Sequence, residues 1–455
     1  MTDDSCARRA VLASACAALL CCAIATPAAA RRKQPEPLPP ATSGLIDNVN
    51  GLAVGKDGSL ERFTGLLIDG TGRVERRLTR EEDRPARLAW RLDGKGQTLI
   101  PSFVDAHARV IDSGISLITL DISGARSLAE AQAKITAWLR DNPGRRWILG
   151  RGWDASGWGG LPSARDLDAV TGDTPAWLIS ADGRTGWANS ATLRLAGIKP
   201  GAASGAFSGA ERERLEQSVP SPSPKDRDVA LDKAQRMFIS RGISTVADMG
   251  TTIDDWQAFR RAGDRGALRL RISGYADGVA QMVTIAGPAP SLWLYDGKLR
   301  LGGVRIDIPA SAMDSTRLRN QASRAAMDGF QIAFAPDGPA AQHEAEAAIA
   351  ELRETYTGDR RWRIETDDDD VSFALLARLA AANRGDIAPA LAALTSRNAH
   401  ALFADEQIGA LAPGQWADFL IVDRDISAAA SDIAATKLLE HWIAGRRAWS
   451  AADAK

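Results

Sequence analysis

Few residues of this 455-residue sequence are of the types that commonly carry out chemistry. There are four histidines, and one of them, His107, directly follows an apolar run from Leu99 to Val104. His343 and His400 lie in segments with helical patterning, and His441 lies near a strand-like segment at the end of the chain. An imidazole can serve as a general base or a metal ligand, but we interpret these last three as ordinary structural or surface residues.

Four consecutive aspartates, Asp367 to Asp370, are a second feature with chemical potential. A carboxylate cluster at the end of a strand can bind a hard cation such as Ca²⁺ or Mg²⁺. Adjacent like charges repel each other, however, and four neighbouring side chains cannot all point inward. We therefore favour a solvated loop over a cation site for this run.

Tryptophans are numerous, and several of the thirteen gather in one stretch: Trp153, Trp158, Trp177 and Trp187. They could line a pocket for a ring-bearing ligand, although core packing explains most of them at least as well. The sequence holds no Gly-x-Ser-x-Gly elbow, phosphate loop or dinucleotide fingerprint. The formal net charge of −1 does not favour nucleic acid or an anionic membrane surface as a partner.

The beginning of the chain is typical of an export signal. Arg8 and Arg9 precede an apolar run from Ala10 to Ala25 that is too short for a comfortable membrane span, and Ala28-x-Ala30 suits signal peptidase. We expect a signal peptide over residues 1–30, periplasmic export (with a weak twin-arginine indication) and a proline-rich linker over 31–42. All four cysteines lie within the signal, so the mature chain is expected to have neither disulfides nor thiolate ligands.

The helices and strands that must position these residues follow two sequence patterns, one before and one after Thr98. Short β-like runs broken by glycine extend from Gly44 to Gln97 and predict a small antiparallel sheet. After Thr98, strands alternate with helices, and one such helix begins at the capping-box pair Ser127 and Glu130. This alternation predicts an α/β fold with a parallel sheet, and at this length a (β/α) barrel.

Several segments, in order, resemble one family. LIPSFVDAHARV (99–110) resembles the first barrel strand of amidohydrolases, and GWDASGWGG with the following DGRTGWANS resembles the insertion of amidohydrolase family 3. The segments LGGVRIDIPAS, DGFQIAFAPDGPAA, RWRIE and LTSRNAHALFADEQIGALAPGQWADFLIVDRD continue the same order. The resemblance covers most of residues 44–450.

This resemblance implies a TIM-like barrel with a small β-sandwich formed by both chain ends. The implied divisions are 43–97 and 406–455 for the sandwich, and 98–405 for the barrel with its insertion near 150–200. The family's usual activity is hydrolysis of C–N bonds of small amides with one or two divalent metals, typically zinc, which activate a water.

The resemblance also marks the positions that hold metal ligands in the family. His107 remains, but Arg109 stands at the second histidine, Arg305 at the lysine, Ala335 at a further histidine and Thr366 at the last one. Pro339 stands at an aspartate, Arg184 at the histidine of the insertion, and the aspartate of the eighth strand has no counterpart. About two barrel strands are missing, so we expect a barrel that is either incomplete or closed differently, and no metal cofactor is expected.

Two hypotheses remain open at this point. In the first, the protein is still a hydrolase, with Asp105, His107 and Glu365 as acid–base candidates. In the second, it is a non-catalytic pseudoenzyme that binds a small molecule or a protein partner. Arg109, Asp182, Arg184 and Arg305 are the predicted binding residues, and a guanidinium at a former ligand position could neutralise Asp105 or Glu365 as a cation would.

Overall fold

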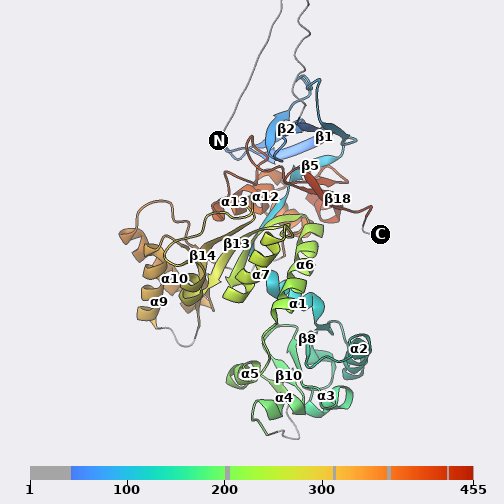
Figure 1. The fold of residues 1–455 in the computed structure, drawn as a ribbon, viewed down its shortest axis with the longest axis vertical. Coiled ribbons are helices and arrows are strands. Elements are labelled where there is room, and N and C mark those ends of the chain that lie inside the picture. The colour runs from blue at the N-terminus through green and yellow to red at the C-terminus, as the bar shows by residue number, and fades with distance from the viewer. Residues whose placement is uncertain (1–41, 200–204, 311–313, 366–369, 428–429, 454–455) are drawn as a thin grey trace, which may run out of the picture. The chain divides into compact units, whose positions relative to one another are not determined.

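The computed structural model of the protein describes residues 42–199, 205–310, 314–365, 370–427 and 430–453 (Figure 1). The predicted signal peptide, Thr366 and Asp367 to Asp369 lie outside these ranges. Within the part of the chain described, no helix is both long and apolar enough to span a membrane.

A six-stranded sheet of parallel strands carries the strand ends that the sequence analysis singled out. Its order is β16-β15-β14-β13-β12-β6. The strands are β6 (Phe103–Ala108), β12 (Ile243–Thr251), β13 (Arg271–Asp277), β14 (Leu299–Ile308), β15 (Gln331–Pro336) and β16 (Arg363–Ile364). The sheet forms a curled half-barrel, which agrees with the expectation of an incomplete TIM-like barrel.

Helices follow the strands of this sheet, as the alternating pattern predicts. They are α1 (Val110–Ile118), α6 (Pro224–Ser240), α7 (Ile253–Asp264), α8 (Gly278–Ala286), α9 (Ser315–Met327) and α10 (Pro339–Thr355). Figure 1 shows α9 and α10 beside β14, and α6 packs against β12 and α8 against β13. Leu301, Val304 and Ile306 of β14 belong to the core cluster that includes alanines of α9 and α10, so burial of apolar surface holds these helices on the sheet.

After β16 the described chain continues as helices rather than as further strands. These are α11 (Phe373–Ala382), α12 (Ile387–Leu394) and α13 (Ser396–Ala401). Ala399 of α13 packs in one cluster with Met249, Tyr275 and Ala333, which come from three barrel strands. The last helix therefore occupies the inner face of the half-barrel.

The insertion forms its own five-stranded sheet, which begins already at Leu120. Its strands are β7 (Leu120–Asp121), β8 (Ile148–Trp153), β9 (Ala176–Ser180), β10 (Gly186–Ala188) and β11 (Ala206–Phe207). Its helices are α2 (Leu128–Asp141), the short 3₁₀ turn η1 (Ala155–Gly157), α3 (Ala164–Thr171), α4 (Ser190–Leu195) and α5 (Gly209–Glu216). The predicted cap is confirmed, because the Ser127 side chain accepts a hydrogen bond from the Glu130 backbone N–H.

Both chain ends meet in an eight-stranded sheet. It comprises β1 (Gly44–Val54), β2 (Leu60–Ile68), β3 (Val74–Leu78), β4 (Trp90–Asp93), β5 (Thr98–Pro101), β17 (Phe419–Val422), β18 (Leu438–Ile443) and β19 (Arg446–Ser450), with the 3₁₀ turn η2 (Ala430–Ala435) before β18. Strand β5 lies between β1 and β17 and so joins the two chain ends. Hydrogen bonds connect these strands as one sheet, and the second layer of a sandwich stays a prediction.

A buried ion pair connects this sheet to the half-barrel. Arg271 of β13 makes two contacts with Asp418, at 3.0 and 3.2 Å, and both side chains are 3% exposed. Asp418 also accepts a hydrogen bond from the Ala444 backbone N–H at 2.7 Å. The charges are therefore compensated by direct partners in a region from which water is largely excluded.

Candidate functional site

The carboxyl ends of the six parallel strands bring together most of the predicted site residues. Asp105 and His107 lie on β6, Arg305 on β14, and Glu365 directly after β16. Asp277 on β13 pairs in register with Arg305, and Asp307 pairs with Ala335 of β15. In a (β/α) barrel this is the end at which active sites are built.

Three side chains join the two edges of the half-barrel, and we call them the edge bridge: His107, Arg363 and Glu365. His107 Nδ1 contacts Glu365 Oε2, and Arg363 Nε lies 2.7 Å from Glu365 Oε1. Arg363 also donates from Nη2 to the backbone oxygen of Ala106 at 2.6 Å. Because β6 and β16 are the edge strands, these contacts join the two open sides of the sheet.

Aromatic and amide groups support Arg363 from inside the half-barrel. Its guanidinium lies 5.1 Å from the ring centre of Tyr275, which is buried and donates a hydrogen bond to Gln331. Helix α13 adds two contacts, because Asn398 donates to the Val104 carbonyl at 2.7 Å and Gln331 donates to the Ala401 carbonyl at 2.9 Å. The edge bridge is therefore held by packed neighbours rather than by the two strands alone.

The arginine that neutralises Glu365 was not among those singled out from the sequence. Arg109 lies 3.4 Å from Asp112, and Arg305 lies 2.7 Å from Asp307. Glu365 is instead paired with Arg363, two residues before it on the same segment. The guanidinium that pairs with Glu365 is therefore that of Arg363 and not one at a predicted former ligand position.

The Asp105 side chain contacts the backbone of its own strand, because its Oδ1 accepts a hydrogen bond from the His107 backbone N–H at 2.9 Å. This contact fixes the backbone at the residue that carries the imidazole. Asp105 therefore acts on His107 through the main chain, and His107 and Glu365 are the two acid–base candidates in direct side-chain contact.

Sequence reasoning missed Asp277, which lies at the same end of the sheet. Although the residue is solvent-exposed, neighbouring atoms partly bury its carboxyl, and this desolvation raises its pKa above the usual 3.8. Repulsion from Asp307 acts in the same direction, whereas Arg109 and Arg305 oppose it. The signal available in the sequence was a carboxylate directly after an apolar strand and before Gly278.

Asp248 of β12 was missed as well, and its role is structural. Burial raises the pKa of its carboxyl to about 7, although it accepts hydrogen bonds from Thr251 Oγ1 at 2.6 Å and from the Val110 backbone N–H at 2.7 Å. Val110 is the first residue of α1, so Asp248 supplies an acceptor to an N–H that the helix itself leaves unpaired.

The described residues do not fit a divalent metal. Among them, no three His, Cys, Asp or Glu side chains lie close enough together to hold an ion. His107 is engaged by Glu365, Arg109 and Arg305 bring positive charge, and the Ala335 methyl offers no donor atom. Pro339 is the first residue of α10, and Thr366 lies outside the described residues. The metal content of the protein stays a prediction.

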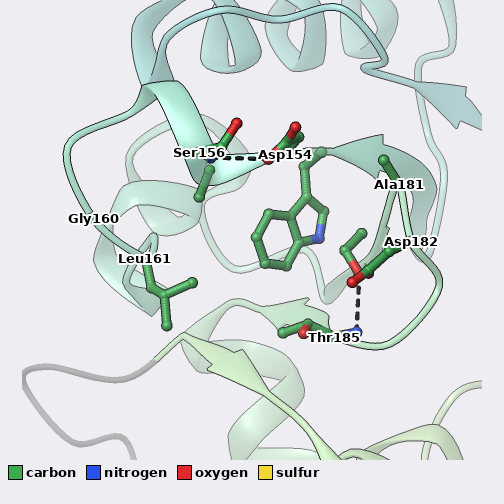
Figure 2. Close-up of a pocket in the computed structure, with 10 residues that line it drawn as sticks. Asp154, Ser156, Gly160, Leu161, Ala181, Asp182 and Thr185 are labelled. Atoms are coloured by element: carbon green, nitrogen blue, oxygen red, sulfur yellow. Dashed lines mark hydrogen bonds between the residues drawn. The ribbon is translucent and has the colours of Figure 1, made fainter.

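The other two predicted binding residues lie in the insertion. Asp182 is in the turn between β9 and β10 and lines a pocket of about 480 Å³ (Figure 2). Arg184 is exposed in the same turn and does not line this pocket. The structure therefore places Asp182 and Arg184 in a different sheet from the edge bridge.

Comparison with known proteins gives the family. The family model described as "Amidohydrolase family" matches residues 92–385. The chain belongs to the amidohydrolase family. A curated relative, Protein LONG AFTER FAR-RED 3 of Arabidopsis thaliana, is 27% identical over 387 residues, which cover 72% of this chain and 61% of that protein. N-substituted formamide deformylase of Arthrobacter pascens is 33% identical over 111 residues, covering 24% of this chain and 20% of that enzyme.

Solved structures agree with this assignment at the level of the fold. Two proteins described as uncharacterized metal-dependent hydrolases, from Pyrococcus furiosus and Pyrococcus horikoshii, match with TM-scores of 0.68 and 0.67 at 18% identity. Each comparison covers 85% of this amidohydrolase-family chain and nearly all of the other protein. The curated relatives extend further, since this chain spans about three fifths of the plant protein's length.

Proposed function

We propose that this amidohydrolase-family protein has lost metal-assisted hydrolysis of C–N bonds and serves as an exported small-molecule-binding protein. The observation that carries the proposal is the edge bridge. His107, the one histidine retained at a former ligand position, is engaged by Glu365, and Glu365 in turn is neutralised by Arg363. A donor set that is internally satisfied and carries arginines at two neighbouring positions does not favour binding of a divalent cation.

The residues at the strand ends support a polar binding surface. Arg109 is 42% exposed at its side chain, whereas Arg305 is 18% exposed and held by Asp307. Fixed guanidinium groups next to carboxylates can orient a polar ligand by charge-assisted hydrogen bonds without any metal.

Metal-free hydrolysis is the second candidate, and Asp277 is the observation that favours it. A carboxyl with a raised pKa is better matched to proton transfer near neutral pH than an ordinary aspartate. In this scheme Asp277 would move the proton, and Asp105, His107 and Glu365 would position it. An activity that disappears in Asp277→Asn but persists in Asp112→Asn, a nearby exposed carboxylate, would favour this second candidate.

The deciding experiment is to purify the mature protein from its native compartment without chelators. We expect an intact mass lacking about the first thirty residues, well under one tightly bound transition metal per chain, and no turnover of N-substituted formamides or small amides. Cell fractionation should place the protein in the periplasm. One or two equivalents of zinc, iron or manganese together with amide hydrolysis would contradict the proposal.

A further inference from the structure

The pocket in the insertion is built by two loops at the ends of neighbouring strands. One loop follows β8 and begins with Asp154, and the other is the turn between β9 and β10 that contains Asp182. Figure 2 shows Asp154 and Ser156 at the upper edge of the pocket, Ala181 and Asp182 on the right, and Leu161 on the left. Its volume of about 480 Å³ is in the range that holds a small organic ligand.

The charged residues that line this pocket are both acidic. Asp154 Oδ1 accepts a hydrogen bond from the Ser156 backbone N–H at 2.9 Å. Asp182 Oδ1 accepts two, from Ser180 Oγ at 2.5 Å and from the Arg184 backbone N–H at 3.0 Å. Within the described chain, the second oxygen of each carboxylate takes no hydrogen bond. These two oxygens are therefore available to a ligand with donor groups.

The Ser180 hydroxyl and the Arg184 N–H hold the pKa of the Asp182 carboxyl below its usual value, so Asp182 is ionised at neutral pH. Among the ten residues that line the pocket, there is no lysine, arginine or histidine. The lining thus has a charge of one sign with no basic residue to cancel it locally.

The other lining residues are mixed: three carry hydroxyl groups (Ser156, Ser180 and Thr185), and Trp153 and Leu161 are the large apolar side chains. Trp153 is 3% exposed, and its indole N–H donates to the Leu178 carbonyl at 2.9 Å. Trp158 and Trp187 pack against it, each with a ring centre 6.2 Å away, so the expected tryptophan group is a packed core that presents one indole to the pocket. At the rim, Leu161 is 73% exposed and adds apolar surface to the pocket.

We propose that this pocket binds a small organic cation, namely an amine with an aromatic or branched apolar body. The ammonium group would lie between the free oxygens of Asp154 and Asp182, and the apolar body would lie against Trp153 and Leu161. This inference rests on the proposed function, since it assigns the class of small molecule that the protein binds.

Arg184 provides a test of which sign of ligand charge the pocket prefers. Its charge acts on Asp182 through space, yet its side chain does not line the pocket. Removing this charge in Arg184→Gln should strengthen binding of a cation by about twofold, because an exposed charge is largely screened. The same substitution should weaken binding of an anion.

The experiment compares three probes of one shape: phenethylamine as its ammonium ion, 2-phenylethanol and 3-phenylpropionate. Binding to the mature protein is measured by ligand-observed NMR. We expect the ammonium ion to bind at least about tenfold more tightly than the alcohol, and the carboxylate not to bind. Asp154→Asn and Asp182→Asn should each weaken binding of the ammonium ion by about tenfold. Asparagine keeps the oxygen that accepts the turn hydrogen bonds but removes the negative charge.

The matched control is Asp173→Asn in the same region, at a fully exposed carboxylate that does not line the pocket. Its affinity for the ammonium ion should equal that of the wild type. Equal binding of the three probes, or unchanged affinity in both pocket variants with folding intact by circular dichroism, would overturn the assignment.

Failure of this inference is distinguishable from failure of the proposed function. A metal-free, hydrolytically inactive protein that does not discriminate the probes would leave the proposed function standing and remove the cation pocket. A protein with stoichiometric zinc and amidase activity that still prefers the ammonium ion would remove the proposed function and leave the cation pocket standing.

Discussion

Replacing Glu365 by glutamine removes the negative charge that lies between His107 and Arg363, while the shape of the side chain stays nearly the same. Glu365 is 7% exposed, and its partners His107 and Arg363 are 32% and 19% exposed. Removing one partner of a buried ion pair costs about 3–5 kcal/mol. Because the glutamine side chain has nearly the same shape and its oxygen can remain beside the Arg363 guanidinium, we expect a loss near the low end, about 3 kcal/mol in the free energy of unfolding.

The assay is urea denaturation followed by tryptophan fluorescence, with linear extrapolation to water. Glu351→Gln is the matched control, because Glu351 also pairs with an arginine, Arg319 at 2.9 Å, but is 54% exposed. An exposed pair of this kind contributes about 1 kcal/mol or less. If both variants lose the same stability, or Glu365→Gln loses none, the edge bridge does not hold the half-barrel together.

A zinc titration separates the edge bridge from a hidden metal site. Ligand binding to the folded state raises its apparent stability. We expect added zinc to leave the urea midpoint of the wild type unchanged, because His107 and Glu365 are already paired. A zinc-dependent increase that vanishes in Glu365→Gln would show that Glu365 is a metal ligand and would refute the reasoning.

Other buried polar groups give further expectations. Burial raises the pKa of Asp248 to about 7, so between pH 3.8 and about 7 the folded chain keeps a proton that the unfolded chain has released. The contribution of Asp248 to the free energy of unfolding should therefore fall as the pH rises through this window, and the difference between the wild type and Asp248→Asn in urea titrations measures it. Burial lowers the pKa of His441 from its usual 6.5 to about 4, so the contribution of His441 should fall as the pH drops through that interval, and the difference between the wild type and His441→Asn measures it. Asp418→Asn leaves the Arg271 charge buried without its carboxylate and should cost about 3–5 kcal/mol by denaturation, whereas a loss below about 1 kcal/mol would mean that water replaces the partner.

Much of the local structure could be predicted from the sequence. The Ser127 cap and the parallel alternation after Thr98 are both confirmed. These features depend on residues that are close in the chain, such as a capping side chain and the N–H three residues later. The expectation that barrel strands are missing agrees with the described chain, which continues after β16 as the helices α11, α12 and α13.

The site itself was only partly predictable. His107 and Glu365 could be named from the sequence, but their contact joins residues 258 positions apart. Arg363 was not singled out, because nothing local distinguishes it from the other arginines. Asp277 and Asp248 owe their raised pKa values to desolvation, which depends on what packs around a carboxyl rather than on its neighbours in sequence.

The sequence by itself therefore determined the family resemblance and the order of the elements, and it carries the prediction that Arg109, Arg305 and Ala335 stand at former ligand positions. Only the tertiary structure decided what the retained residues do. The closeness of β6 to β16 sets the pairing of His107 with Glu365, and the two loops after β8 and β9 place Asp154 near Asp182 in one pocket. Both outcomes depend on how the strands curl and pack, because distances between residues far apart in the chain follow from the packing of the whole core and not from local patterns.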